Sequence, residues 1–215
     1  MTASIPPPSP WRAAGQRDKR VRGWLRREGL PLLCLLGLLL VARSSLANHY
    51  YVPSGSMEPT LLPGDRVVVD MRSYGLRVPF TQWAVWGGET PERGDVVVFR
   101  SPSDGVRLIK RVVAVGGDRV DLVDGRLTIN GTPLADRRDA PEDFGDVQVT
   151  LNLDAGGGPD LADLEVPEGQ VLVLGDHRGA SIDGRYFGFV PAAAIYGQAR
   201  GVFWRTGDGF GWRKL

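Results

Sequence analysis

Short apolar runs rich in β-branched residues recur after residue 48, and they constrain the fold more than any other feature. The seven runs are RVVVDM (66–71), DVVVFR (95–100), RLIKRVVAV (107–115), DRVDLV (118–123), RLTI (126–129), QVLVLG (170–175) and ARGVFW (199–204). Asp124-Gly125 separates two of them and is a strong type I′ hairpin signal, and Asn130-Gly131 marks a second turn. Helical periodicity is absent after residue 48. The pattern predicts a mostly β, partly barrel-like antiparallel domain over 49–215.

Residues 119–169 are expected to form a smaller inserted subdomain of strands and loops. The part from 135 to 169 carries ten acidic groups against two arginines and contains GGGP at 156–159. Glycine, proline and charged residues at this density are typical of turns and solvent-exposed segments. We therefore expect 135–169 to be a surface excursion rather than part of the core.

An uncharged apolar run, LPLLCLLGLLLVA at 30–42, precedes the β region. The run has no polar face, which favours a lipid environment, although crossing a bilayer takes about 20 residues. With the residues up to 48 included, we expect 30–48 to form a single transmembrane helix that anchors the protein. The alternative is a cleavable signal peptide, because SLA at 45–47 places small residues at the first and third positions before a possible cut.

Charge is distributed unevenly along the chain. Residues 1–28 carry seven basic and two acidic side chains, whereas the whole chain has a net charge of only +1. Basic flanks stay on the cytoplasmic side of a membrane, so we expect a basic, partly disordered cytoplasmic tail over 1–29 and an extracytoplasmic domain over 49–215. Nucleic-acid binding is not expected, because it needs a basic face on the folded part. The single cysteine, Cys34, excludes an intrachain disulfide.

Two serines stand two residues apart in VPSGSMEPTL (52–61), among glycine and proline residues that restrict the backbone. A serine hydroxyl, here Ser54 or Ser56, becomes a nucleophile when a positioned base takes its proton. Only three of the 26 lysine and arginine side chains are lysines, and Lys110 is the only one in the body of the β domain. A buried lysine can lose its proton, whereas arginine cannot. Lys110 is therefore a candidate base, the alternative being that it points out of its strand.

A histidine is another candidate for the base. His49 adjoins the apolar run, whereas His177 lies in GDHRGASIDGR, close to Asp183. A Ser56–His177–Asp183 triad is therefore an alternative to a serine–lysine pair. The sequence shows no coherent metal-ligand spacing and no nucleotide-binding motif, so we expect neither a metal nor a cofactor.

Five segments carry a resemblance to a known family. They are VPSGSMEPTL (52–61), GDRVVV (64–69), RGDVVVFR (93–100), IKRVVAVGGD (109–118) and GDHRGASIDGRYFGFVP (175–191). In this order and spacing they resemble the five successive boxes of bacterial type I signal peptidases. These are membrane-anchored serine/lysine endopeptidases that remove signal peptides from exported proteins. One box alone is a weak signal, whereas five in order are highly specific.

The resemblance implies a role for each matching residue. Ser56 corresponds to the nucleophile, Lys110 to its general base, and Ser54 to the serine whose hydroxyl forms the oxyanion hole with the Ser56 N–H. The other matches are Ser181, which would orient the lysine amine; Asp183 and Arg185, a supporting ion pair; and Tyr50, Val52, Met57 and Ile109, which would line shallow pockets for small P1 and P3 side chains.

Four positions depart from the family's pattern. The family often has Asn at the position of His177 and Ser at that of Gly184, and it usually has Gly and Pro at those of Ala114 and Gly116. These departures remove no catalytic group, but they alter the surroundings of the site. His177 is accordingly expected to support the site or lie at the surface.

The expected function is removal of signal peptides at the bacterial cytoplasmic (inner) membrane, through an acyl-enzyme at Ser56. The expected partners are preproteins emerging from the secretion machinery and membrane lipid. The segment PFTQWAVWGG (79–88) contains Phe80, Trp83 and Trp86, which would either dip into the membrane interface or pack in the core. The alternatives are a dedicated serine/lysine peptidase of the conjugative pilin type and a catalytically silent, membrane-tethered β domain that binds peptides.

Overall fold

The computed structural model describes residues 25–36, 47–74 and 88–215, and the chain divides into two units, Met1–Ser44 and Ser45–Leu215. In the first unit, the π-helical segment η1 (Leu25–Gly29) continues as α-helix over 30–36. Within the described part of the chain, none of the helices has the length and the apolar sequence that a bilayer crossing requires. Residues 37–46 of the expected anchor lie outside the described ranges, as do Phe80, Trp83 and Trp86. The anchor and the role of these aromatic residues stay predictions.

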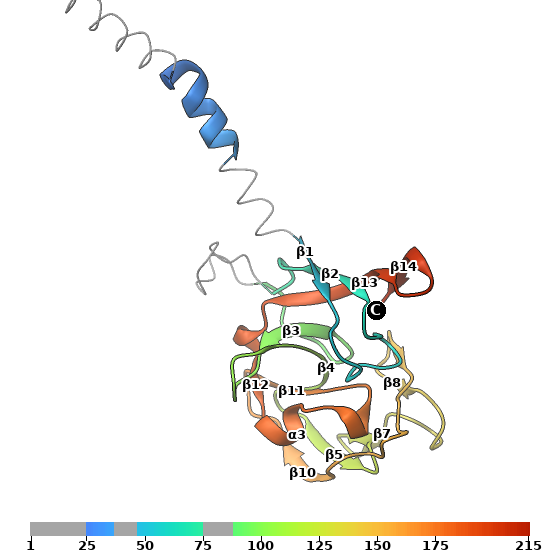
Figure 1. Ribbon diagram of the computed structural model, residues 1–215. Helices are drawn as coiled ribbons and strands as arrows, with labels where there is room; N and C mark the ends of the chain where they lie inside the picture. The colour runs from blue at the N-terminus through green and yellow to red at the C-terminus, as the bar shows by residue number, and fades with distance from the viewer. Residues whose placement is uncertain (1–24, 37–46, 75–87) are drawn as a thin grey trace, which may run out of the picture. The chain divides into compact units, whose positions relative to one another are not determined.

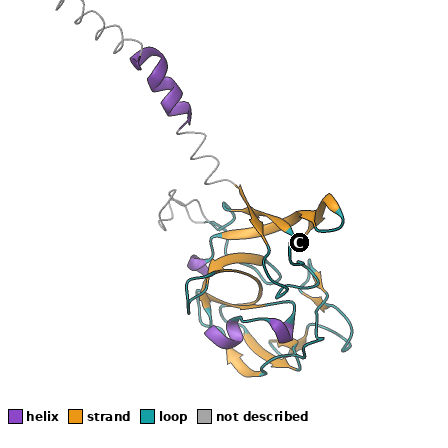
Figure 2. Cartoon of the chain, viewed as in Figure 1, coloured by secondary structure: helices purple, strands orange, loops and turns teal. Residues whose placement is uncertain are grey.

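The second unit consists mainly of antiparallel strands, with only short helical turns (Figures 1 and 2). The largest sheet contains, in spatial order, β1 (Ala47–Tyr51), β2 (Arg66–Asp70), β13 (Gly197–Arg205), β3 (Val96–Arg100), β4 (Arg107–Val115), β11 (Gln170–Leu174) and β12 (Val190–Pro191), with β14 (Gly209–Lys214) paired to β13. The helical turns are η2 (Arg178–Ala180), α3 (Gly184–Phe187) and η3 (Ala192–Ala194). The predicted mostly β, antiparallel fold is confirmed.

The seven predicted runs all form strands, with limits within two residues of those expected. Their β-branched side chains fit a pleated, half-buried surface. Both predicted turns are also confirmed, because the two central residues of each have positive φ. The values are 50° and 78° at Asp124-Gly125 and 52° and 79° at Asn130-Gly131, as a type I′ turn requires. β1 begins at Ala47, so it includes the last two residues of the segment expected as the anchor.

The residues of the expected insertion form two separate sheets. β5 (Arg119–Val123), β6 (Arg126–Ile129), β7 (Thr132–Pro133) and β10 (Leu161–Glu165) make a four-stranded sheet in the order β10-β5-β6-β7, and β8 (Glu142–Asp143) pairs with β9 (Gln148–Val149). The four-stranded sheet shares a hydrophobic cluster with the main sheet, in which Val120 and Leu122 pack with Leu172 and Leu174. The main sheet and the four-stranded sheet are therefore parts of one packed unit.

The expectation that residues 135–169 stay out of the core is wrong in part. Glu142, Val149 and Val166 are only 0%, 1% and 1% exposed. Glu142 tolerates burial because the Arg178 guanidinium lies 2.7 Å from its carboxylate and the Leu127 N–H donates to it at 2.9 Å. A buried charge needs such partners, and a count of acidic residues gives no indication of them.

Strands β3 and β4 lie in the middle of the main sheet (Figure 1). On β3, Val96 and Val98 pack in one hydrophobic cluster, whereas Val97 and Phe99 pack in another. Hydrophobic clusters therefore cover both faces of β3. β4 is flanked by β3 and β11, and its residues 110–114 are buried, so polar side chains in the middle of β4 are taken out of water.

Candidate active site

The predicted serine pair lies in the turn that follows β1. Val52 and Met57 flank the pair and are buried in the core, at 2% and 0% exposure, whereas Ser54 is exposed and Ser56 half-buried. The Val52 N–H donates to the Asp65 carbonyl at 2.9 Å, which fixes the start of the turn. Buried anchors on both sides thus present the two hydroxyls from a restrained backbone.

The structure brings Lys110 to this turn from the middle of β4. Its Nζ lies 2.6 Å from the Ser56 Oγ, and the residue is only 3% exposed, so the alternative in which Lys110 points out of its strand is wrong. Burial lowers the pKa of Lys110 from 10.5 to about 8, although the charges of Asp183 and Asp176 act in the opposite direction. A cation loses hydration when it is buried, so the neutral amine is favoured. A neutral amine beside a hydroxyl can act as its base.

The side chains of the alternative histidine triad are not hydrogen-bonded to one another. The His177 ring faces the Asp154 carboxylate at 2.6 Å through Nε2 and the Gly55 carbonyl at 3.3 Å through Nδ1. The Asp183 carboxylate pairs with the Arg185 guanidinium at 2.8 Å. The base that the geometry offers to Ser56 is therefore Lys110.

Asp183 and Arg185 form an ion pair of buried side chains whose charges act on Lys110. Both side chains are 0% exposed, and the Asp183 carboxylate also accepts from the Gly175 N–H at 2.9 Å. The remaining Arg185 N–H groups donate to the carbonyls of Gly157 and Arg178, at 2.7 and 2.6 Å. The opposite charges and these hydrogen bonds offset the cost of taking both side chains out of water.

Ser181 lies at the site, but its contact with the lysine amine remains a prediction. Its hydroxyl is buried and has no hydrogen-bond partner among the described residues. A Cβ at Gly175 would collide with the Ser181 Oγ and with the Ser56 carbonyl. Gly175 therefore lets the segment after β11 pack directly against the nucleophile's turn.

A second buried ion pair, which sequence reasoning missed, joins the elements of the site. Arg111 and Asp176, each 1% exposed, pair at 2.7 Å, and the Thr60 hydroxyl donates to the same carboxylate at 2.6 Å. The three residues link β4, the segment after β11 and the serine segment. The signal for Arg111 was its place next to Lys110 in an apolar strand.

A pocket of about 390 Å³ opens beside the serine pair. It is lined by Ser54, Gly55, Ser56, Glu58, Leu108, Lys110, His177, Ala180 and Ile182. The lining combines apolar walls with a nucleophile and a base, as expected where an extended peptide is cut. Sequence reasoning did not assign Glu58, Leu108, Ala180 or Ile182 to the site. Glu58 lies two residues after Ser56, whereas the other three come close to Ser56 only through the fold.

The four residues predicted to line substrate pockets lie in or against the hydrophobic core and not beside the serine pair. Val52 and Met57 belong to the buried cluster, and Tyr50 and Ile109 pack against it. None of the four belongs to the lining of the pocket beside Ser56. Their contacts with substrate stay a prediction.

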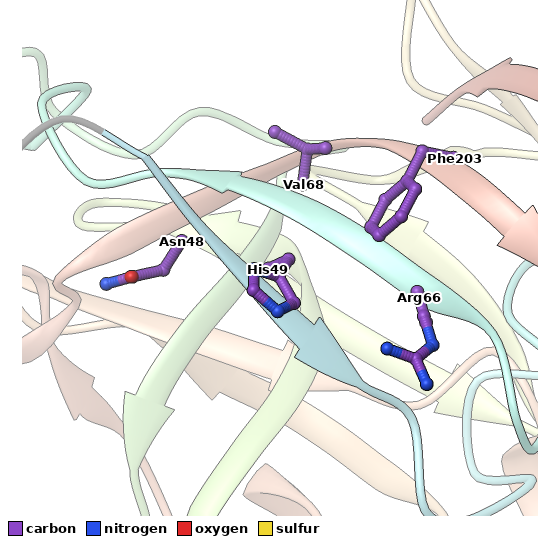
Figure 3. A pocket seen from close by; sticks show the side chains of 5 residues that line it. All are labelled: Asn48, His49, Arg66, Val68 and Phe203. Carbon is purple, nitrogen blue, oxygen red and sulfur yellow. The ribbon is translucent and has the colours of Figure 1, made fainter. Parts of the chain in front are cut away.

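A second pocket, of about 450 Å³, lies at the β1 end of the sheet (Figure 3). Asn48 and His49 come from β1, Arg66 and Val68 from β2, and Phe203 from β13. The His49 and Phe203 rings meet edge to face, with centroids 6.3 Å apart. The lining contains no nucleophile and base in contact, so the pocket beside Ser56 is the candidate active site.

Comparisons with known proteins identify the family of the chain. The family model described as "Signal peptidase, peptidase S26" matches residues 25–204. A signal peptidase I from Pseudomonas fluorescens is 36% identical over 201 residues, which cover 81% of this chain and 71% of the relative. A signal peptidase I from Leptolyngbya laminosa is 32% identical over 212 residues, which cover 94% of this chain and 89% of the relative. The chain belongs to the peptidase S26 family of signal peptidases, and it is a serine peptidase of the type I signal peptidase class.

Proposed function

We propose that Ser56 and Lys110 cleave signal peptides by nucleophilic catalysis. The observation that carries this mechanism is the 2.6 Å distance between the Lys110 Nζ and the Ser56 Oγ, with the lysine buried and its pKa lowered to about 8. At such a pKa a useful fraction of the amine is neutral near neutral pH. A neutral amine accepts the hydroxyl proton as the oxygen attacks the scissile carbonyl carbon.

The same pair carries the reaction to its end. The tetrahedral intermediate collapses to an ester on Ser56, and the protonated Lys110 gives its proton to the departing amine of the mature protein. A water then attacks the ester while Lys110 accepts its proton, which releases the signal peptide and restores both groups.

The proposed oxyanion hole consists of the Ser54 hydroxyl and the Ser56 N–H. The Ser54 Oγ lies 3.5 Å from the Ser56 Oγ, so it stands beside the atom that attacks. The Ser56 N–H has no hydrogen-bond partner among the described residues, which leaves it available to a substrate oxygen. A donor already aimed at the developing charge stabilises the transition state more than the substrate.

The proposed substrates are preproteins that carry a signal peptide. We further propose that residues 30–48 anchor the enzyme in the bacterial cytoplasmic membrane, with residues 1–29 inside and the β unit outside, so that Ser56 meets preproteins after translocation. The uncharged run and the basic segment before it support this orientation.

Cleavage of a preprotein by the full chain tests the mechanism. Ser56→Ala and Lys110→Arg should each lower kcat by at least about 1,000-fold, because one removes the nucleophile and the other replaces the base with a group that stays protonated. Lys214→Arg makes the same change at an exposed lysine and should leave the rate unchanged. Cleavage by Lys110→Arg at the wild-type rate would exclude the neutral-lysine mechanism.

A panel of unrelated preproteins tests the breadth of the substrate class. A general signal peptidase should cleave most of the panel after small residues, whereas a dedicated processing peptidase would cleave one substrate. Binding of signal peptides without cleavage, together with no labelling of Ser56 by an acylating inhibitor, would indicate the silent peptide-binding domain.

A further inference from the structure

His177 contacts both peptide units that flank the nucleophile. Its backbone N–H donates to the Ser56 carbonyl at 3.2 Å, and its ring Nδ1 lies 3.3 Å from the Gly55 carbonyl. The residue is 9% exposed and follows β11, where it pairs with Asn152 in a parallel bridge. It therefore connects the serine turn to the insertion.

Both ring nitrogens of His177 face oxygen atoms. Nε2 faces the Asp154 carboxylate at 2.6 Å, Nδ1 faces the Gly55 carbonyl, and the Glu58 carboxylate lies 3.9 Å from Nδ1. The carboxylate and carbonyl oxygens are acceptors, so a ring nitrogen bonds to them as a donor. Hydrogen bonding to His177 in turn holds the pKa of Asp154 below its ordinary value. The contact with Asp154 thus holds the orientation of the ring, with Nδ1 directed at the Gly55 carbonyl.

The Gly55 carbonyl belongs to the same peptide unit as the Ser56 N–H. A trans peptide is planar, so its C=O and N–H point in opposite directions, and a group that holds one fixes the direction of the other. The Glu58 N–H also donates to this carbonyl, at 3.0 Å. A carbonyl oxygen has two lone pairs, so the Glu58 N–H and the His177 ring can hold it together.

We propose that His177 is a positioning residue, which holds the Gly55 carbonyl so that the Ser56 N–H faces the oxyanion. The inference rests on the proposed function, in which that N–H is an oxyanion donor. His177 does not touch the reacting atoms. Its loss lets the peptide unit rotate, and a misdirected donor stabilises the transition state less, with little effect on substrate binding.

The test compares His177→Asn with His177→Leu in the full chain. The Asn amide nitrogen takes roughly the place of Nδ1 and can donate to the Gly55 carbonyl, although it cannot reach Asp154. Leucine fills similar space without a donor. We expect His177→Leu to lower kcat by about 10- to 100-fold, with KM within about threefold of the wild type, since a single oxyanion donor contributes about 100- to 1,000-fold. His177→Asn should keep kcat within about threefold of the wild type.

An acylating inhibitor counts the folded sites in each preparation, so that kcat refers to competent enzyme only. Equal loss of kcat in both variants would show that the ring only fills space, and wild-type kcat in His177→Leu would show that Glu58 alone holds the carbonyl. Either result overturns the inference. Failure of the wild-type enzyme to cleave, with Ser56→Ala no different from it, would instead overturn the proposed function.

Discussion

Lys110 and Arg111 are neighbours on β4, both are cations, and both are buried, but their surroundings differ. The Arg111 guanidinium forms two hydrogen bonds to the Asp176 carboxylate, at 2.9 and 2.7 Å, and a third to the Gly94 carbonyl at 2.6 Å. The Lys110 amine has the Ser56 hydroxyl as its partner at 2.6 Å, and no ion pair joins it to another described residue. The charge of Arg111 is therefore neutralised by a carboxylate in direct contact, whereas the charge of Lys110 is not.

This difference makes Arg111 a structural cation and Lys110 a candidate for acid–base chemistry. A buried arginine stays charged, so it needs a carboxylate in contact. Arg111 has this partner, and its hydrogen bonds link three elements around the site. A buried lysine without such a carboxylate lowers its pKa instead, which is the property that a general base needs. Asp183 and Asp176 raise the pKa of Lys110 without reversing the effect of burial.

Breaking the compensated pair should have the largest effect on stability. Asp176→Asn leaves the Arg111 charge buried beside a neutral amide, and removing one partner of a buried pair costs about 3–5 kcal/mol. Urea unfolding should report a decrease of that size in the free energy of unfolding. A decrease below about 1 kcal/mol would contradict the assignment of Arg111 as a compensated structural cation.

A double variant controls for the size and shape of the site. Arg111→Met combined with Asp176→Leu removes both charges and keeps apolar volume, so it should recover much of the stability that Asp176→Asn loses. If the double variant were less stable than Asp176→Asn, the hydrogen bonds to Gly94 and Thr60 would matter more than the charges.

The sequence predicted the parts of the molecule that depend on local pattern. β-branched runs and Asp-Gly and Asn-Gly turns specify strands and hairpins through neighbouring residues, so β4 and the β5–β6 hairpin were predicted within a residue or two. Lys110 was identified because a lysine is rare in this chain, and the five ordered segments identified the family. The edge strands β7, β8 and β12, each two residues long, have no pattern of their own.

The rest of the site depends on contacts between segments far apart in the chain. The Arg111–Asp176 and Arg178–Glu142 pairs join residues 65 and 36 positions apart, and no local periodicity indicates either partner. The role of His177 depends on a single carbonyl in the serine turn, whose direction only the folded backbone fixes. Such pairings follow from the topology of the sheets and not from composition.

Removing the uncompensated cation should stabilise the protein. The pKa of Lys110 falls from 10.5 to about 8 on folding, so below pH 8 the folded state holds a proton at a cost of about 3 kcal/mol. Lys110→Met should therefore raise the free energy of unfolding by up to about 3 kcal/mol at pH 7, with a gain that shrinks as the pH approaches 10.5. Urea unfolding of both proteins between pH 7 and 10 measures the difference. A variant less stable than the wild type at pH 7 would show that the hydrogen bond to Ser56 outweighs the burial of the charge.

The pH dependence of cleavage gives the smallest effect and the sharpest comparison. Lys110 works as a base only when neutral, so kcat/KM should fall about tenfold per pH unit below the pKa of about 8 and level off above it.

Asp176 raises the pKa of Lys110, so Asp176→Asn should move the midpoint of the pH profile to lower pH, because losing a nearby anion disfavours the ammonium. Profiles for the wild type and this variant, measured at low salt on the folded fraction, test both statements. A wild-type midpoint near 10.5 would mean that burial does not tune the lysine. A midpoint that rises in Asp176→Asn would mean that Asp176 acts on Lys110 through packing. The different roles of Lys110 and Arg111 would then not follow from the charges around them.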